Sequence, residues 1–367
     1  MSTGSFSSNQ TFYMLGLAVL VSALLTLEGY ALSPVSGSSS PWRSTICWSP
    51  DGTPRPSARG PRTSRDWTAL RAGAEGMDAR RIFQAAMSVK QDDLYIVGAG
   101  YLGTLIGKQW REKFPSATIY AETRTTSKHD VLRAEGVTPI LRHLRKEGQR
   151  CTNVVFCASP SGNEDYSGEV AAAAAEVWDG EGTFVFTSSS GIYAENDGGT
   201  VTEQSPLSDS PRAAKLRGAE LACTQAGGCV VRLAGLFSLE RGPHNFWLGK
   251  EEVTSSPDGL INLLSYEDAA GVVIAVLLAH QQGRVFLAAD HCPMTRRDIC
   301  AAALSHPMYS DRSMPQAGGG GEAGTGGRRE GKGKVFDSRV TRRDLSWEPR
   351  HTSFAEFIED VKGRDGK

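Results

Sequence analysis

The sequence lacks the cysteine spacing of a metal module. Its seven cysteines are scattered over 367 residues with no C-x-x-C pair, so the pattern indicates neither a zinc site nor a disulfide framework. An odd, scattered set of thiols favours a reducing compartment, or at least a protein that is indifferent to redox conditions. We therefore predict no structural metal. The cysteines are Cys47, Cys151, Cys157, Cys223, Cys229, Cys292 and Cys300.

An excess of charge of either sign is also absent. The chain has 40 Lys+Arg against 41 Asp+Glu, and basic patches interleaved with aromatic residues are missing. Proteins that bind nucleic acid through their backbone phosphates carry a basic footprint. The composition therefore argues against direct DNA binding.

No apolar run near the N-terminus is long enough to cross a bilayer. Residues 12–27 form a mainly apolar run of 16 without a charge, whereas a membrane-spanning helix needs about 20 residues. The run has the length of a signal-peptide core, and Gly29, Tyr30 and Ala31 follow it as a small-x-small cleavage pattern. A short signal-anchor helix is the alternative, because no Lys or Arg precedes the run. We interpret residues 1–31 as signal-peptide-like and expect no stable membrane span in the mature protein.

The segment that follows has too few apolar residues to bury a core. Residues 33–65 contain nine Ser, six Pro and five Arg, with Asp51 as the only acid. A signal-like run followed by such a segment resembles the bipartite presequences of algae with secondary plastids. We interpret residues 32–87 as a transit-peptide-like, largely disordered presequence and predict a plastid location. Secretion, with a disordered linker after the signal, is the alternative.

Glycine, in contrast, is abundant and unevenly placed. Of 41 glycines, nine fall between Gly318 and Gly333. This composition is typical of a flexible linker, so we interpret residues 316–333 as an inserted loop, with a functional lid as the alternative. The remaining body, residues 88–362, is predicted to be one domain.

A dinucleotide-binding motif opens that body. The apolar run 93–97 predicts a strand that leads directly into Gly98-x-Gly100-x-x-Gly103. The spacing of apolar residues predicts a helix ending before Pro115, and residues 117–121 predict a second strand. In such a βαβ unit the glycines allow a tight turn, close approach to a pyrophosphate and close helix packing, and the helix N-terminus faces the phosphates. We predict that Gly98, Gly100, Tyr101, Leu102 and Gly103 bind a dinucleotide.

The residues after the second strand leave the choice of dinucleotide open. Glu122 stands where an acid normally binds the ribose hydroxyls, which favours NAD. Arg124 and Lys128 follow it and could neutralise a 2′-phosphate, which favours NADP; a solvated loop is the alternative for both. The predicted cofactor is therefore NAD(P), with Glu122 and Arg124 in its site.

Two further strands end in small and hydroxyl-bearing residues. Residues 153–158 predict a strand, and its end at Ala158 and Ser159 lies where ligands bind in open parallel sheets. Residues 183–186 predict another strand, after which Ser188, Ser189 and Ser190 follow. We expect Ala158 and Ser159 to contact the cofactor.

The serine segment carries a family resemblance. TFVFTSSSGIYAENDGGTVTEQSPL resembles the extended short-chain dehydrogenases/reductases, the NAD(P)-dependent epimerases and dehydratases of sugar nucleotides. VRLAGLF with RGP, and NLLSYEDAA, are similar to later segments of that family. The resemblance covers roughly residues 93–361 and implies an α/β Rossmann fold, a doubly wound parallel sheet with a small C-terminal substrate lobe formed after Arg232. It also implies that Ser189 is the catalytic serine.

The catalytic Tyr-x-x-x-Lys pair of that family is missing. Where it is expected, Arg212 stands at the Tyr position and Leu216 at the Lys position. An Arg stays protonated, so Arg212 can orient an anion but cannot act as the ordinary acid/base. Lys215 and Arg217 flank these positions and are candidates for the missing cation.

Other residues are weaker candidates. Tyr193, on the same loop as Ser189, is a candidate proton donor; a structural tyrosine is the alternative. His244 is expected either over the substrate or on the surface in a turn. We expect Asn262 and Asp268 to be structural.

SPRAAKLRGAE and the C-terminal pattern from Gly333 to Phe354 are similar to an atypical branch of the family that lacks the Tyr/Lys pair. The resemblance implies an NAD(P)-dependent oxidoreductase or epimerase/dehydratase-like enzyme. Its expected substrate is a small molecule, either a sugar nucleotide or another carbonyl or hydroxyl compound. The alternative is a non-catalytic NAD(P)-binding protein, either a redox sensor or a plastid assembly or RNA-associated factor. The oligomeric state is not indicated.

Overall fold

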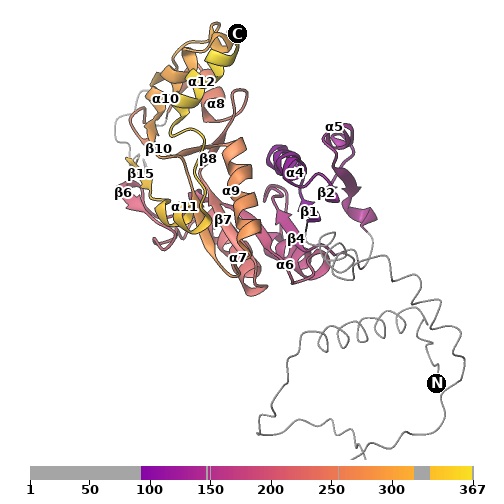
Figure 1. Cartoon of the computed structure of the whole chain (residues 1–367). Helices are drawn as coiled ribbons and strands as arrows, with labels where there is room; N and C mark the ends of the chain where they lie inside the picture. The colour runs from indigo at the N-terminus through magenta and orange to yellow at the C-terminus, as the bar shows by residue number, and fades with distance from the viewer. Residues whose placement is uncertain (1–91, 146–147, 149, 255, 318–330, 366–367) are drawn as a thin grey trace, which may run out of the picture. The chain divides into compact units, whose positions relative to one another are not determined.

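A parallel sheet of seven strands forms the centre of the structure, a computed structural model that describes residues 92–145, 148, 150–254, 256–317 and 331–365 (Figure 1). The strand order is β12-β7-β5-β4-β1-β2-β3, and every neighbouring pair is parallel. The order reverses between β1 and β4, which is where ligands bind in sheets of this kind. The strands are β1 (Leu94–Val97), β2 (Ile119–Thr123), β3 (Thr138–Leu141), β4 (Asn153–Phe156), β5 (Phe184–Ser189), β7 (Cys229–Leu233) and β12 (Val285–Ala288).

Helices cover both faces of this sheet, as the resemblance predicted. Because side chains alternate along a strand, Leu94 and Ile96 pack toward α4 and α9, whereas Tyr95 and Val97 pack toward α6 and α7. Each strand is therefore buried on both sides, which explains the continuous apolar runs in the sequence. The helices and short turns of this part are α4 (Tyr101–Lys113), α5 (His129–Ala134), η1 (Arg142–Leu144), α6 (Tyr166–Val177), η2 (Ser190–Ile192), α7 (Pro211–Gln225), α9 (Tyr266–Ala279) and α11 (Arg339–Leu345).

A smaller lobe lies beyond the sheet and has its own core (Figure 1). Phe237, Phe354 and Phe357 are in mutual edge-on or stacked contact there. Four short strands, in the order β13-β10-β15-β6, and two strand pairs, β8 with β11 and β9 with β14, complete this part. Its elements are β6 (Asp197–Val201), β8 (Gly235–Phe237), α8 (Pro243–Leu248), β9 (Glu252–Val253), β10 (Leu260–Ile261), β11 (Leu263–Ser265), β13 (Met294–Thr295), α10 (Arg296–Leu304), η3 (Pro307–Tyr309), β14 (Gln316–Ala317), β15 (Gly333–Phe336) and α12 (Phe354–Asp365).

The boundary of the lobe differs from the predicted one. We expected the segments after Arg232 to form it, but α9 packs on α4 and β12 extends the central sheet beside β7. Conversely, β6 precedes Arg232 in the sequence but belongs to the lobe, because it pairs with β15. Strand pairing between distant segments, rather than chain order, therefore defines the lobe.

Asn262 and Asp268 are structural, as expected. Asn262 Nδ2 donates to the carbonyl oxygen of Lys334 at 2.8 Å, and its Oδ1 accepts from the Phe336 N–H at 2.8 Å. Asp268 Oδ1 accepts from the Arg350 N–H at 2.9 Å, and its Oδ2 accepts from Ser265 Oγ at 2.8 Å. Both side chains join segments far apart in the sequence.

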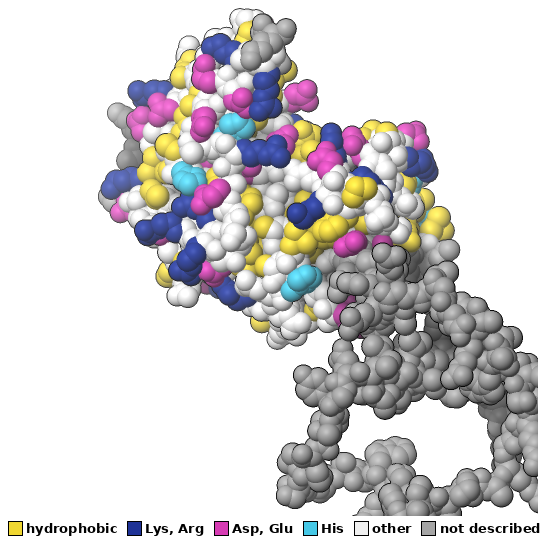
Figure 2. Space-filling model, viewed as in Figure 1, with side chains coloured by type: hydrophobic (Ala, Val, Ile, Leu, Met, Phe, Trp, Pro, Cys, Tyr) yellow, Lys and Arg dark blue, Asp and Glu magenta, His cyan; other side chains and the backbone are white. Residues whose placement is uncertain are grey.

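Several predicted segments lie outside the described residues. These are the signal-peptide-like residues 1–31, the presequence 32–87 and residues 318–330 of the glycine-rich loop. At the ends of that predicted loop, Gln316–Ala317 form β14 and Gly333 begins β15. All of the described residues belong to one unit by contact. Among the described helices, none has the length and apolar character needed to span a membrane. Lys/Arg and Asp/Glu side chains are interspersed over the face shown in Figure 2.

Candidate functional site

The turn between β1 and α4 is built around Gly98. Its φ is +90°, and an added Cβ would lie 2.5 Å from the backbone of Ala158 at the end of β4. The Gly98 N–H donates to the carbonyl oxygen of Glu122 at 3.1 Å, which ties the turn to the end of β2. Only glycine fits both the conformation and the close approach. The ends of three neighbouring strands are therefore held together at this point.

Gly100 and Gly103 differ in their surroundings. Gly100 is the N-cap of α4, and an added Cβ would meet nothing within 4 Å. A Cβ on Gly103 would lie 3.0 Å from both Cys157 Sγ and the carbonyl oxygen of Gly98. Gly103 thus allows close packing, whereas Gly100 leaves open space beside the first turn of α4. The N–H groups of a first helical turn have no intrahelical acceptor, so this space suits an anionic group.

Two cavities meet at this turn. The first, about 330 Å³, lies over the ends of β1 and β2, and its lining includes Gly98, Glu122 and Arg124. The second, about 890 Å³, is bounded by α4, the end of β5 and the start of α7. The residues common to both are Gly100, Cys157, Ala158 and Ser159.

The second cavity brings together most of the other predicted site residues. Tyr101, Leu102, Gly103, Ser189 and Arg212 all line it. With the first cavity, every predicted site residue except Tyr193 therefore lies on one continuous surface. Parallel strands make this possible because their carboxyl ends meet at one edge of the sheet.

Ser189 ends β5 at the wall of the second cavity. Its Oγ accepts a hydrogen bond from the Gly191 N–H at 3.2 Å and caps η2. A hydroxyl that accepts one hydrogen bond still has its own hydrogen to donate. Ser189 can therefore donate to a substrate oxygen in the cavity.

Tyr193 is not on this surface, which corrects its predicted role as proton donor. The side chain is buried, and its hydroxyl accepts from Arg232 Nη1 at 3.0 Å. The Arg232 guanidinium also lies 5.0 Å from the centre of the tyrosine ring. Burial raises the pKa of Tyr193, and Arg232 opposes this shift. The phenol is thus part of a buried network, in agreement with the structural alternative.

The start of α7 shows what replaces the missing Tyr/Lys pair. Arg212 is exposed at the edge of the second cavity, and Leu216 is buried in its wall. Lys215 also lines the cavity, but its Nζ donates to the carbonyl oxygen of Pro160 at 3.1 Å and to that of Asn163. Lys215 therefore holds the loop after β4 in place, and an apolar side chain fills the family's lysine position.

His244 occupies neither of its two expected places. It has no exposed surface, and its Nε2 lies 3.0 Å from the Tyr309 hydroxyl and 3.1 Å from the carbonyl oxygen of Leu239. Burial lowers the pKa of the imidazole. His244 belongs to the lobe core and lines neither of the two cavities, so both expectations were wrong.

Sequence reasoning missed an aromatic and cationic group at the second cavity. Arg241 lies 5.0 Å from the ring centre of Tyr101, and the Tyr101 ring meets Tyr266 edge-on at 4.7 Å. Burial raises the pKa of Tyr266, whereas Arg241 lowers it. Arg241 and Tyr266 stand within the two segments that carried the family resemblance, so those motifs were the available signal.

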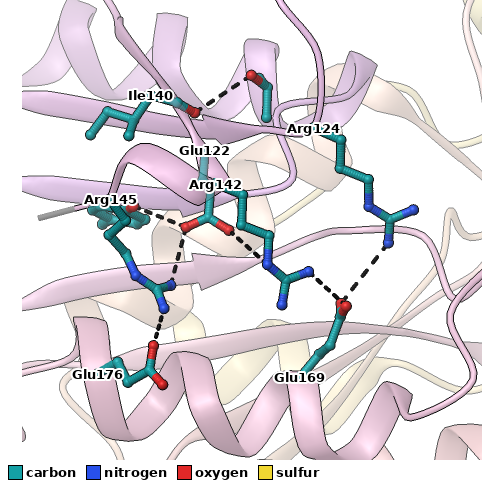
Figure 3. Close-up of polar contacts among 9 residues, drawn as sticks. Glu122, Arg124, Ile140, Arg142, Arg145, Glu169 and Glu176 are labelled. Atoms are coloured by element: carbon teal, nitrogen blue, oxygen red, sulfur yellow. Dashed lines mark hydrogen bonds and ion pairs between the residues drawn. The ribbon is translucent and has the colours of Figure 1, made fainter. Parts of the chain in front are cut away.

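At the first cavity, the structure adds Arg142 and Glu169 to the predicted residues. Figure 3 shows both beside Glu122 and Arg124. Arg142 lies on η1 and Glu169 on α6, and neither residue belongs to a sequence motif that would have marked it. In the part of the chain that the structure describes, no three His, Cys, Asp or Glu side chains gather as metal ligands.

Comparison with known proteins supports the fold. Neither a family model nor a curated protein matches the chain. Among solved structures, a functionally unknown conserved protein from Silicibacter pomeroyi DSS has a TM-score of 0.60 at 19% identity, over 75% of this chain and 99% of that one. MoeE5 in complex with UDP-glucose and NAD has a TM-score of 0.57 at 15% identity, over 75% and 99%.

UDP-glucuronic acid 4-epimerase from Bacillus cereus, in complex with NAD, also has a TM-score of 0.57 at 15% identity, over 75% of this chain and all of that one. Likeness at these identities concerns architecture, since one fold hosts many functions. The chain therefore has the Rossmann-type fold of the nucleotide-sugar epimerases, as the sequence resemblance predicted.

Proposed function

We propose that the protein is an NAD(P)-dependent oxidoreductase or epimerase-like enzyme that acts on a small carbonyl or hydroxyl compound. The observation that carries this proposal is the junction of the two cavities at Gly100, Ala158 and Ser159. A glycine turn lies at this junction, and several hydroxyl-bearing side chains, Ser189 among them, and three cations line the larger cavity beyond it. One extended ligand could thus contact both cavities.

The residues at the junction fit a dinucleotide. Gly98 allows the turn to lie close to the backbone of Ala158, and Gly103 allows α4 to lie close to the carbonyl oxygen of Gly98. The open space beside Gly100 provides the room that a pyrophosphate needs. The turn, the first helical turn of α4, and Ala158 with Ser159 would hold the cofactor. When bound, the nicotinamide supplies or accepts a hydride.

The larger cavity supplies groups for the substrate. The Ser189 hydroxyl can donate to a carbonyl oxygen, and the Arg212 guanidinium stays protonated and favours negative charge on that oxygen. Because Arg212 is exposed, water can deliver the proton that the family's tyrosine would otherwise carry. Arg241 and Lys215 add positive charge to the same cavity, which supports an anionic substrate. The UDP-glucose named with MoeE5 makes a sugar nucleotide one candidate.

The test is turnover by the purified protein. For an oxidoreductase we expect NADH or NADPH to be consumed with an aldehyde or ketone of a test panel. For an epimerase-like enzyme we expect a sugar nucleotide of the panel to be converted with no net consumption of the nucleotide cofactor. Ser189→Ala should then slow turnover by about 10- to 100-fold with nucleotide binding retained. Ser310→Ala, an exposed serine that lines neither of the two cavities, is the matched control. No turnover across the panel, with nucleotide binding intact, would contradict the enzyme proposal.

A second candidate is a non-catalytic NAD(P)-binding protein. The observation that favours it is that Leu216 fills the lysine position and that Tyr193 is buried away from the cavities. In this case nucleotide binding should change the protein's association with a partner. Ser189→Ala should then leave both nucleotide affinity and that association unchanged.

A further inference from the structure

The side chain of Glu122 is committed to protein partners. Its Oε2 accepts from the Tyr95 hydroxyl at 3.0 Å and from Arg145 Nη1 at 3.2 Å, and its Oε1 lies 3.7 Å from Arg142 Nε (Figure 3). Only 4% of the side chain is exposed. A carboxylate that binds a ribose diol needs both oxygens directed at the ligand, whereas this one lies between two guanidinium groups. Its negative charge is therefore compensated, and it repels a nearby phosphate less than a free carboxylate would.

Positive groups surround the same cavity. Arg124 and Lys128 line it from the loop after β2, and Arg142 lines it from η1. Arg124 and Lys128 are exposed, so they can reorient toward a ligand. Thr125 and Ser127 add hydroxyl groups from the same loop. Guanidinium, ammonium and hydroxyl donors together are the set that binds a phosphate monoester.

Glu169 already occupies an anion position within this set. Arg142 Nη1 lies 2.6 Å from Glu169 Oε1, and Arg124 Nη2 lies 4.0 Å from Glu169 Oε2. Arg124 comes from the loop after β2, Arg142 from η1 and Glu169 from α6, so they meet across the cavity (Figure 3). One carboxylate thus lies between two guanidinium groups, where a phosphate with greater charge would be bound more strongly.

We propose that this cavity binds the 2′-phosphate of NADP(H), with Arg124 and Arg142 as its main ligands and Lys128 as a third. The phosphate displaces Glu169 from the two arginines. Arg145 keeps Glu122 compensated and is itself paired with Glu176. This proposal depends on the dinucleotide site of the proposed function and specifies which dinucleotide that site selects.

The first experiment compares affinities in the purified full chain. We expect NADPH to bind at least about 10-fold more tightly than NADH by fluorescence titration. Adenosine 2′,5′-bisphosphate should show the same advantage over 5′-AMP, because the two fragments differ only in the 2′-phosphate. The advantage should shrink at high salt, since the contacts are partly exposed charges. Equal affinities, or a preference for NADH, would overturn this inference and leave the proposed function standing.

Two variants test the ligands. Arg142→Gln should reduce the NADPH/NADH affinity ratio to below about 3, whereas Arg133→Gln should not change it, because Arg133 pairs with Asp130 on α5 outside the cavity lining. Arg142→Gln also removes one partner of Glu122, so this variant could lose affinity through a loss of stability. A second variant, at Glu169, therefore separates an effect on folding from an effect on binding.

Glu169→Gln frees both arginines. It should raise NADPH affinity about 3- to 10-fold and leave NADH affinity unchanged. Equal effects on the two dinucleotides would contradict the inference. If neither dinucleotide nor either fragment binds, the inference and the cofactor site of the proposed function both fail.

Discussion

Arg232 and Glu220 form a buried ion pair below the site, with Arg232 Nη2 2.7 Å from Glu220 Oε2. Ser188 Oγ donates to the same carboxylate at 2.6 Å, and Arg232 also donates to Tyr193 and to the carbonyl oxygen of Glu203. The pair connects β7, α7 and the loop after β5. It therefore holds the loop that follows Ser189 against the sheet.

Breaking this pair should destabilise the fold strongly. Arg232→Leu leaves the Glu220 carboxylate buried with one hydroxyl partner, and we expect a loss of about 3 to 5 kcal/mol in the free energy of unfolding. Urea denaturation measures it. Arg217→Leu is the control, because its pair with Asp209 is exposed and should contribute below about 1 kcal/mol. A similar small loss for both variants would show that the buried pair does not hold the structure.

Two glycine substitutions should separate folding from binding. Gly98→Ala forces a Cβ onto the Ala158 backbone at positive φ, so it should lower thermal stability as well as nucleotide affinity. Gly100→Ala meets no protein atom and has an extended backbone. It should leave the melting temperature unchanged and lower dinucleotide affinity at least about 10-fold, because its methyl group enters the pyrophosphate space. Retained affinity in Gly100→Ala would place the ligand elsewhere.

Tyr193→Phe tests the corrected role of that residue. The change removes the hydroxyl that accepts from Arg232, so we expect a loss of about 1 kcal/mol in the free energy of unfolding. Nucleotide affinity and the turnover rate should stay close to those of the wild type, since the phenol lines neither of the two cavities. If turnover instead slowed by about two orders of magnitude at unchanged stability, Tyr193 would be restored as the proton donor.

Asp290 should make the protein less stable as the pH rises. Burial, with the Asp268 carboxylate adding to it, raises the pKa of Asp290 to about 8, and a backbone N–H at Cys292 opposes the shift. The unfolded chain releases this proton near its ordinary pKa of about 4. Between these two values the folded state holds more protons, so stability falls as pH increases and the loss is complete above the folded pKa.

Asp290→Asn removes this penalty. The gain in the free energy of unfolding over wild type should be larger at about pH 7.5 than at about pH 5, by at most about 3 kcal/mol. Asp258→Asn, at an exposed carboxylate, is the matched control and should show no such pH dependence. A gain that is the same at both pH values would mean that Asp290 ionises normally.

The sequence by itself determined the dinucleotide-type βαβ unit and most of the central sheet. Apolar runs mark strands that are buried on both faces. Gly98, Gly100 and Gly103 form a motif of six residues, in which the local backbone geometry of the turn explains the glycines. Such local patterns can be recognised without knowing which distant residues each segment contacts. The strands β1, β2, β4 and β5 and the helix α4 therefore lie close to their predicted positions.

Only the tertiary structure decided which polar groups face a ligand. Glu122 looked like a free ribose acid, yet Arg142 and Arg145 reach it because β3 pairs with β2 and carries η1 alongside it. Tyr193 follows Ser189 closely in the sequence, yet its hydroxyl is buried and accepts a hydrogen bond from Arg232, 39 residues away. A buried charge or polar group requires a charged or hydrogen-bonding partner. In both cases that partner comes from a segment that the order of the strands brings close, and not from a neighbour in the sequence.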